Sequence, residues 1–148
     1  MIKAVYQESS FPHWHILPVR FRDLDPLNHV NNALYSTYYE EARIAFIQDV
    51  PSLSIQLNQQ FSFVLAHLKI DFIHPVKYPA KLLIGSGILN VGNTSITSFQ
   101  AIYHAQTKEL ASVAEARGVW IDLSQQRPAT LPKIDDVAQL MVDVDEDA

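Results

Sequence analysis

The sequence predicts an α+β protein in which one long helix packs against an antiparallel sheet. Three observations support this prediction. Residues 30–48 carry a helical apolar pattern, residues 15–23 alternate before it, and four alternating stretches follow from Phe63 onward, separated by short turns. Short turns imply antiparallel neighbours, so the four later strands are expected to form a meander.

The first predicted strand spans residues 15–23, and one of its faces is apolar, with Leu17, Val19 and Phe21. The Asp-Pro-Leu-Asn segment at residues 25–28 then predicts a turn, because these residue types favour turn conformations. The strand is therefore expected to bury one face and to lead directly into this turn.

The predicted helix spans residues 30–48. Its apolar positions follow at intervals of four, and two further tyrosines widen the apolar arc; these residues are Val30, Leu34, Tyr35, Tyr38, Tyr39, Ala42 and Phe46. Asn28 can cap its start, and Pro51 follows its end. Few charges interrupt the pattern, so the helix is expected to be largely buried.

Four strands are expected after the helix. The first begins at Phe63, and the others cover residues 81–91, 94–104 and 110–123. Gly85 and Gly87 predict a bend or a bulge in the second of them. Gly92-Asn93 and residues 107–109 are expected to be turns.

Composition narrows the class of protein. The chain has 148 residues, 48% hydrophobic and 18% charged, which is typical of one globular domain. It has no cysteine, which excludes a thiol nucleophile, a disulfide framework and a thiolate metal site. Neither a signal-peptide core in residues 1–11 nor a membrane-spanning apolar run is visible, so we expect no membrane insertion and a cytoplasmic location.

The net charge of −5 is concentrated at the C-terminus. Residues 133–148 hold six acidic residues and one lysine, so the preceding residues have no basic excess. A nucleic-acid partner is therefore not expected. The charge run and the weak periodicity predict a solvated acidic tail over about residues 133–148.

The segment that carries chemistry is the junction between the first strand and the helix. Asp25 precedes the predicted helix start by a few residues. The first N–H groups of a helix lack internal partners, so they can bind an oxygen on which negative charge develops. A carboxylate beside them can act as a base or a nucleophile, and the two together suffice in principle for acyl transfer.

The segment Leu-Asp-Pro-Leu-Asn-His-Val-Asn-Asn-Ala-Leu-Tyr at residues 24–35, followed by Tyr-Tyr-Glu-Glu-Ala-Arg at 38–43, resembles the 4-hydroxybenzoyl-CoA and long-chain acyl-CoA thioesterase family. The resemblance implies a single hotdog domain over residues 1–148, with a core of about 13–123. In that fold a five-stranded antiparallel sheet wraps around one long central helix.

The resemblance also assigns roles to residues. Asp25 matches the catalytic carboxylate, and the N–H of Asn32 lies near the thioester carbonyl. Beside them, His29 is a candidate to orient substrate or water, and capping or packing is its alternative role. The implied substrate contacts are Asn28, Val30, Asn31 and Tyr35, together with Asn93, Thr94 and Ser95 for pantetheine or phosphate. The chain departs from many relatives at Asn28, where they have Gly, and at Pro79-Ala80, where they have Gly-Asp.

The expected reaction is hydrolysis of a fatty or aromatic acyl-CoA to a free acid and CoA, without a cofactor or metal, by a homodimer or homotetramer. Three alternatives stay open: an acyl carrier protein as the thiol carrier, an acyl-CoA-binding protein without turnover, and a hotdog hydratase. At the level of single residues, Asp25 can also serve only an Asx turn. Asp23 is expected to be a turn or salt-bridge residue.

Overall fold

A computed structural model describes residues 6–54, 57 and 60–143. Its main elements are β1 (His13–Pro18), α1 (Leu34–Gln48), α2 (Pro51–Ser54), β2 (Phe61–Phe72), β3 (Lys81–Val91), β4 (Ser95–His104), β5 (Leu110–Asp122) and β6 (Arg127–Pro128). Short 3-10 helices cover Glu8–Ser10, Phe21–Asp23 and Val137–Leu140. Among the described residues, no helix is long and apolar enough to cross a membrane.

The sheet is antiparallel with the order β1-β3-β4-β5-β2, and the two-residue strand β6 pairs with β5. The meander prediction is correct for β3, β4 and β5 but wrong for β2, which pairs with β5 instead of β3. The eight residues between β2 and β3 are too many for a tight hairpin, and β1 occupies the edge of β3 that β2 would need.

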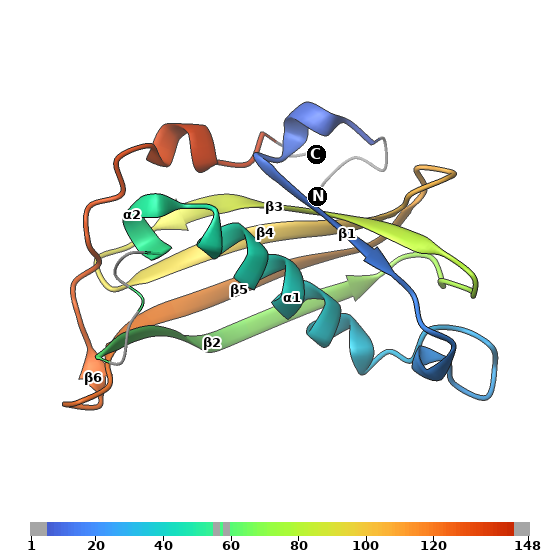
Figure 1. The fold of residues 1–148 in the computed structure, drawn as a ribbon, viewed down its shortest axis with the longest axis horizontal. Coiled ribbons are helices and arrows are strands. Elements are labelled where there is room, and N and C mark those ends of the chain that lie inside the picture. The colour runs from blue at the N-terminus through green and yellow to red at the C-terminus, as the bar shows by residue number, and fades with distance from the viewer. Residues whose placement is uncertain (1–5, 55–56, 58–59, 144–148) are drawn as a thin grey trace.

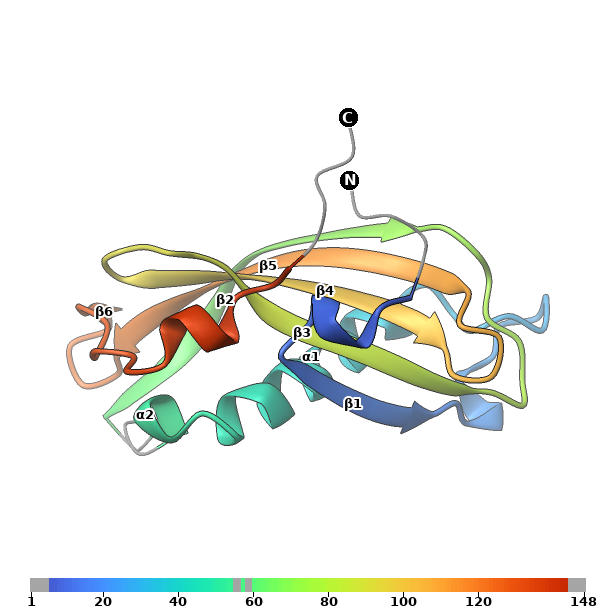
Figure 2. The same ribbon diagram turned by 90° about the horizontal axis from the view of Figure 1, so that it is seen from above.

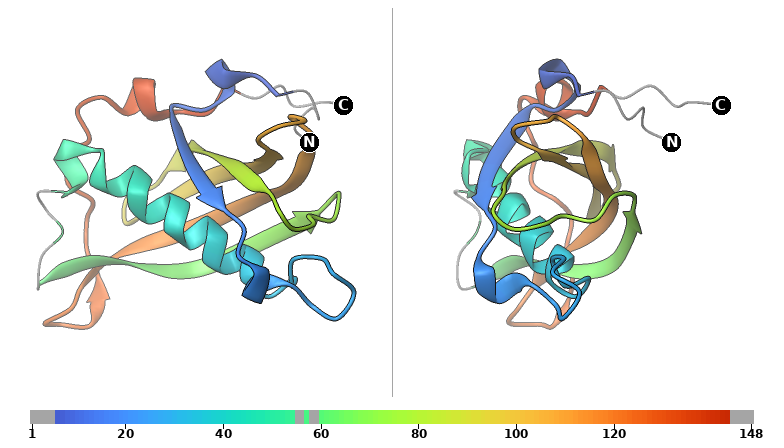
Figure 3. Two further views of the ribbon diagram at one scale, coloured as in Figure 1. Left: turned by 45° about the vertical axis from the view of Figure 1, so that its right-hand side comes forward. Right: turned by 90° about the vertical axis from the view of Figure 1, so that its right-hand side faces the viewer.

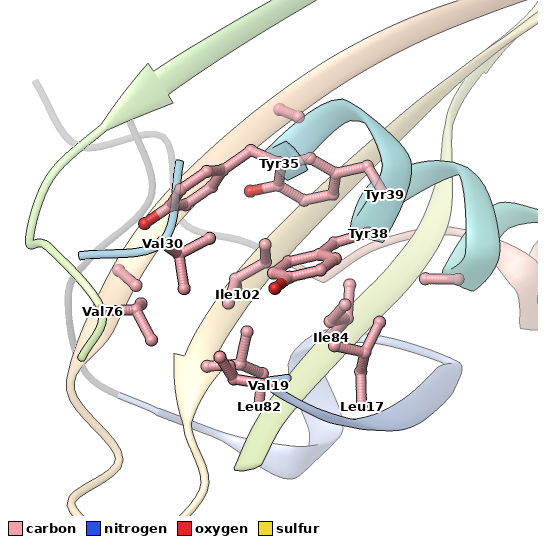
Figure 4. Packing of buried hydrophobic residues seen from close by; sticks show 13 residues of the cluster. Leu17, Val19, Val30, Tyr35, Tyr38, Tyr39, Val76, Leu82, Ile84 and Ile102 are labelled. Atoms are coloured by element: carbon pink, nitrogen blue, oxygen red, sulfur yellow. The ribbon is translucent and has the colours of Figure 1, made fainter. Parts of the chain in front are cut away.

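Helix α1 crosses the concave side of the curled sheet, as Figures 1 and 3 show. The predicted apolar face is buried, with Tyr35, Tyr38, Tyr39, Ala42 and Phe46 turned inward. Figure 4 shows the three tyrosines packed with aliphatic side chains from β1, β3 and β4, such as Leu17, Ile84 and Ile102. The expected hotdog architecture, one helix wrapped by a five-stranded sheet, is confirmed.

Two element boundaries differ from the sequence prediction. β1 ends at Pro18, because the carboxylate of Asp23 binds back to Arg20 and folds the next residues into a 3-10 turn. α1 begins at Leu34 and not at Val30, because the N–H of Val30 donates to Val76 O at 2.8 Å and that of Asn31 to Asp23 O at 2.9 Å. Hydrogen bonds to neighbouring segments thus replace the first helical turn.

Residues 6–12 and 141–143 cover part of the convex face of β3 and β4. Figure 2 shows the short helices at Glu8–Ser10 and Val137–Leu140 in front of the sheet. A methyl group at Gly85 would lie 2.5 Å from the Phe11 ring, and one at Gly87 would lie 2.5 Å from Val142 Cγ1. The two glycines therefore serve close packing of the terminal segments more than a bend in β3.

The prediction of a solvated tail is wrong for residues 134–143. Ile134, Val137 and Leu140 are partly buried against the apolar cluster around Phe46 and Ile88. The N–H of Val142 donates to Ile88 O at 2.9 Å, and the N–H of Asp143 donates to Ser10 O at 2.8 Å. The half-buried Val142 side chain packs on the aromatic cluster around Phe11. Charge counting missed this contact because Met141 and Val142 carry it within an acidic segment.

Removal of residues 141–148 is expected to lower the free energy of unfolding by about 1 to 2 kcal/mol, since it exposes part of a valine and the surface below it. Removal of residues 144–148 alone keeps these contacts and serves as the control. Urea unfolding of both truncated chains measures the difference. Equal midpoints for the two would show that the Val142 contacts contribute nothing.

Candidate active site

The loop between β1 and α1 folds back on itself through a short antiparallel bridge and projects from one end of the molecule (Figure 1). Leu24 and Val30 form a bridge, and the N–H of Asp25 donates to His29 O at 2.8 Å. The N–H of Asn28 donates to Asp25 O at 3.0 Å, which closes the predicted turn at residues 25–28. Backbone hydrogen bonds therefore set the position of Asp25.

Asn28 adopts a left-handed conformation with φ of 63°. Asn tolerates this region better than most residues, and Gly, the residue expected in relatives, tolerates it best. The role of Asn28 as helix cap is wrong, because α1 begins six residues later. The cap residue of α1 is Ala33, and no side chain caps the helix. Asn31 closes the turn before it: its Oδ1 accepts from Ala33 N at 3.0 Å, and its carbonyl accepts from Leu34 N at 2.9 Å.

The half-buried Asp25 carboxylate uses one oxygen for the turn. Its Oδ1 accepts from the N–H of Leu27 at 2.8 Å and from that of His29 at 3.3 Å. Within the described part of the chain, no hydrogen bond reaches Oδ2. The Asx-turn role weighed from the sequence is therefore present, and it still leaves one oxygen able to face water or an acyl carbon.

Asn32 lies at the start of α1, and its side chain is exposed. Its backbone N–H has no acceptor among the described residues, which is the condition for an oxyanion donor. The His29 backbone pairs with Asp25 and bridges to Lys77, while its imidazole is half-buried and meets no hydrogen-bonding partner in residues 6–54 or 60–143. One loop therefore carries the carboxylate of Asp25, the N–H of Asn32 and the imidazole of His29.

Asp23 anchors this loop. Its side chain is 2% exposed and accepts hydrogen bonds from the Tyr38 hydroxyl at 2.7 Å and from Arg20 Nη2 at 2.9 Å. Burial alone would raise the pKa of the Asp23 carboxyl, but these hydrogen bonds outweigh burial and hold the pKa below its usual value. Burial and the bond to Asp23 together raise the pKa of Tyr38. The expected salt-bridge role of Asp23 is confirmed.

The role of Tyr38 as a partner of Asp23 does not follow from the sequence pattern. Its place on the apolar face of the helix indicated only a core residue. A buried tyrosine hydroxyl nevertheless needs an acceptor, and that requirement was the available signal.

Two of the expected substrate contacts lie in the core. Val30 is 2% and Tyr35 is 3% exposed, and the Tyr35 ring meets that of Phe72 at a centroid distance of 4.9 Å. Figure 4 shows both side chains pointing into the apolar cluster. In this chain Val30 and Tyr35 belong to the apolar core beneath the loop, whereas Asn28, Asn31 and Asn32 are exposed.

Asn93, Thr94 and Ser95 lie at the opposite end of the sheet from Asp25. Lys81, at the start of β3, pairs with Pro18 close to the loop, whereas Val91 at its other end pairs with Ile96 beside the hairpin. The hairpin backbone is held by bonds from Trp120 N to Thr94 O and from Leu131 N to Asn93 O. One copy of the chain thus does not bring this hairpin to Asp25.

Comparison with known proteins identifies the class. The chain belongs to the thioesterase-like superfamily, whose family model matches residues 19–140. It is similar to the Escherichia coli long-chain acyl-CoA thioesterase FadM, with 28% identity over 115 residues that cover 78% of this chain and 87% of that protein.

Two further relatives are informative. The chain is 27% identical over 120 residues to the chloroplastic acyl-acyl carrier protein thioesterase ATL2 of Arabidopsis thaliana, which covers 78% of this chain but only 62% of that protein. A thioesterase from Thermus thermophilus, crystallised with coenzyme A and zinc, is 30% identical with a TM-score of 0.72, covering 88% of this chain and 97% of that one. In this chain, the described residues contain no group of three or more His, Asp or Glu side chains that could hold a metal ion.

Tyr38→Phe is expected to lower the free energy of unfolding at pH 7 by about 1.5 to 3 kcal/mol, the usual contribution of a hydrogen bond to a charged group. The loss should shrink in acid. The folded-state pKa of Asp23 lies below its unfolded value of about 3.9, so its contribution is present above that pH and disappears as pH falls through the folded pKa.

Urea unfolding at pH 7 and at pH 3 measures both effects. Tyr78→Phe, which removes a hydroxyl from an exposed ring, is the matched control and should change little. A loss for Tyr38→Phe that is no larger than that of the control would contradict the anchoring role of Asp23.

Proposed function

We propose that this protein hydrolyses acyl-CoA thioesters to a free acid and CoA. The observation that carries the proposal is the loop at the start of α1, where the free oxygen of Asp25 and the unpaired N–H of Asn32 belong to one hydrogen-bonded frame. A carboxylate and an oxyanion donor are the two elements that acyl transfer to water requires. Membership in the thioesterase-like superfamily supports the same reaction.

In the proposed reaction, the thioester carbonyl lies at the N–H of Asn32, which binds the oxygen as it becomes negative. Asp25 either takes a proton from the attacking water or attacks the carbonyl carbon itself, forming an anhydride that water then opens. In both routes the C–S bond breaks, the thiolate of CoA leaves and is protonated, and the acid is released. His29 is proposed to orient substrate or water beside Asp25.

Acyl carrier protein is the second candidate thiol carrier, because one of the similar curated proteins is an acyl-acyl carrier protein thioesterase. The two carriers present the same pantetheine thioester, so the chemistry at Asp25 is unchanged. Hydrolysis of one acyl group carried on CoA and on acyl carrier protein separates the candidates.

A cytoplasmic location stays a prediction.

We further propose a homodimer formed through β2, with a tetramer as the larger alternative. β2 is a 12-residue strand at the edge of the sheet, and Val64, Leu65 and Phe72 on it are 47%, 47% and 52% exposed. A long edge strand with exposed apolar side chains needs pairing or cover. Antiparallel pairing of β2 with a second copy would satisfy both its backbone groups and these side chains.

Such a dimer would also determine which copy brings the hairpin at residues 93–95 near Asp25. A two-fold axis through the middle of β2 runs the two copies of α1 in opposite directions. The start of α1 in one copy then lies beside the end of α1 in the other, which is the end where Asn93, Thr94 and Ser95 are found. A substrate contact with this hairpin is therefore proposed to come from the second copy.

Asp25→Asn is expected to lower the turnover of acyl-CoA by at least about a hundredfold, since it removes the charge and the basicity of the carboxylate. Folding and acyl-CoA binding should be kept, because the amide oxygen can still accept from Leu27 and His29. Steady-state thiol release, together with calorimetric binding, tests the prediction.

Glu109→Gln is the matched control for Asp25→Asn, because Glu109 is an exposed carboxylate on a turn. Asp23 cannot serve as the control, since it is buried and holds the loop. Wild-type turnover in Asp25→Asn would sink the proposed mechanism. A wild type that binds acyl-CoA and hydrolyses none would favour the binding-protein alternative.

Val64→Lys is expected to convert the dimer to a monomer, because a charge on the edge strand opposes pairing. Ile16→Lys is the matched control: Ile16 is 62% exposed on β1, the strand at the other edge of the sheet. Light scattering at micromolar concentration gives the oligomeric state. A monomeric, fully active wild type would refute the dimer.

A further inference from the structure

A largely apolar cavity of about 370 Å³ lies between the second half of α1, helix α2 and strands β2 to β5. Its walls include Phe46 and Ile47 from α1 and Val50 from the link to α2. Phe63, Ile88 and Ile96 line it from the sheet. This volume is within the range of small-ligand sites. The cavity lies at the other end of α1 from Asp25, so it is not part of the loop described above.

Small residues on the concave face of the sheet keep this cavity open. Ala116 and Gly118 of β5 and Ser98 of β4 line it. A methyl group at Gly118 would lie 3.3 Å from the Phe63 ring, so even alanine would crowd this wall. Core positions of a sheet usually carry large side chains, and here three neighbouring positions do not.

The cavity wall also contains a cation without an anionic partner. Arg43 is half-buried, and its Nη1 donates to the neutral Oε1 of Gln100 at 3.2 Å. Gln100 is completely buried and donates in turn to Tyr39 O and Ser86 Oγ. No carboxylate of the described chain forms an ion pair with Arg43. Burial lowers the pKa of its guanidinium more than the charge of nearby Glu40 raises it.

The cavity therefore has apolar walls and one guanidinium, that of Arg43, which is held by the buried side-chain amide of Gln100 and has no anionic partner among the described residues. Such a site suits a ligand with an apolar chain and a negatively charged or carbonyl group at one end. We propose that this cavity is an acyl-chain site, which takes an unbranched aliphatic chain and, when the ligand is a free fatty acid, binds its carboxylate at Arg43. This site names the class of acyl group that the enzyme prefers, and that part of the inference rests on the proposed thioesterase function.

The volume sets the length of the chain. A methylene displaces about as much volume as a water molecule in the liquid, roughly 30 Å³, so the cavity holds about ten to twelve methylenes. A benzoyl ring would fill only about half of it on the same scale. The site therefore favours chains near dodecanoyl over aroyl groups.

The acyl chain in the cavity can belong to one of two ligands, an acyl thioester or a free fatty acid. Within one copy, helix residues 34–43 separate the Asp25 loop from Arg43 in the cavity wall, a length of about 15 Å. The dimer proposed above places the Asp25 loop of a second copy beside the end of α1 that lines this cavity, so that loop would hold the thioester while the acyl chain lies in the cavity. The other ligand is the free fatty acid after its release, which would bind with its carboxylate at Arg43.

The first experiment compares hydrolysis of butanoyl-, dodecanoyl- and benzoyl-CoA by the wild type and by Ser98→Leu. Leucine fills the space of about two methylenes, and each excluded methylene costs about fourfold. We expect the kcat/KM for dodecanoyl-CoA to fall on the order of tenfold, while that for butanoyl-CoA stays within about threefold. Thr97→Leu adds the same side chain on the opposite face of β4 and should leave the profile unchanged.

The second experiment measures dodecanoate binding by calorimetry in the Asp25→Asn background, where no hydrolysis is needed. Ser98→Leu should weaken binding on the order of tenfold. Arg43→Gln should weaken dodecanoate by at least about tenfold and leave dodecanol unaffected, since only the acid has a charge for the guanidinium. If Ser98→Leu does not fold, Phe63→Leu widens the same cavity and should shift the preference to longer chains.

The outcomes separate this proposal from the proposed function. Dodecanoate binding that depends on Ser98 and Arg43, without hydrolysis of any acyl-CoA, supports the acyl-chain site and refutes the thioesterase. A changed chain-length profile without dodecanoate binding identifies the thioester as the source of the chain. A profile and a dodecanoate affinity that are both unaffected by the cavity variants would overturn the acyl-chain site.

Discussion

The buried carboxylate of Asp23 is the interaction on which the arrangement of the candidate site depends. An ionised carboxylate without partners is costly in a protein interior, so the chain has to bring donors to it. Arg20 and Tyr38 provide them, one from the end of β1 and one from the second turn of α1. The backbone carbonyl of Asp23 also accepts a hydrogen bond from the N–H of Asn31, so the strand, the loop and the helix meet at Asp23.

The apolar face of α1 could be predicted from the sequence because the helical period determines which side chains share a face. The tyrosines at positions 35, 38 and 39 are buried as that period requires. The pairing of β2 with β5 could not be predicted in the same way. Alternation identifies a strand and its buried face, but it contains no information about which neighbour the strand selects.

The candidate site was partly predictable. The turn at residues 25–28 follows from local residue preferences, and the structure contains it. The first turn of the helix depends on long-range bonds, such as that from Val30 to Val76, which no local pattern contains. The cavity could not be predicted for a related reason: Ser98 lies on a different strand from Ala116 and Gly118, and only the β4–β5 register makes it their neighbour.

The bond between Asp143 N and Ser10 O places the two ends of the described chain next to each other, on the face of the sheet opposite α1. A probe attached near residue 10 or at Asp143 would therefore lie on the same side of the molecule. The loop that carries Asp25 follows β1 at a different end of the molecule (Figure 1), so such a probe would leave access to the helix start unchanged.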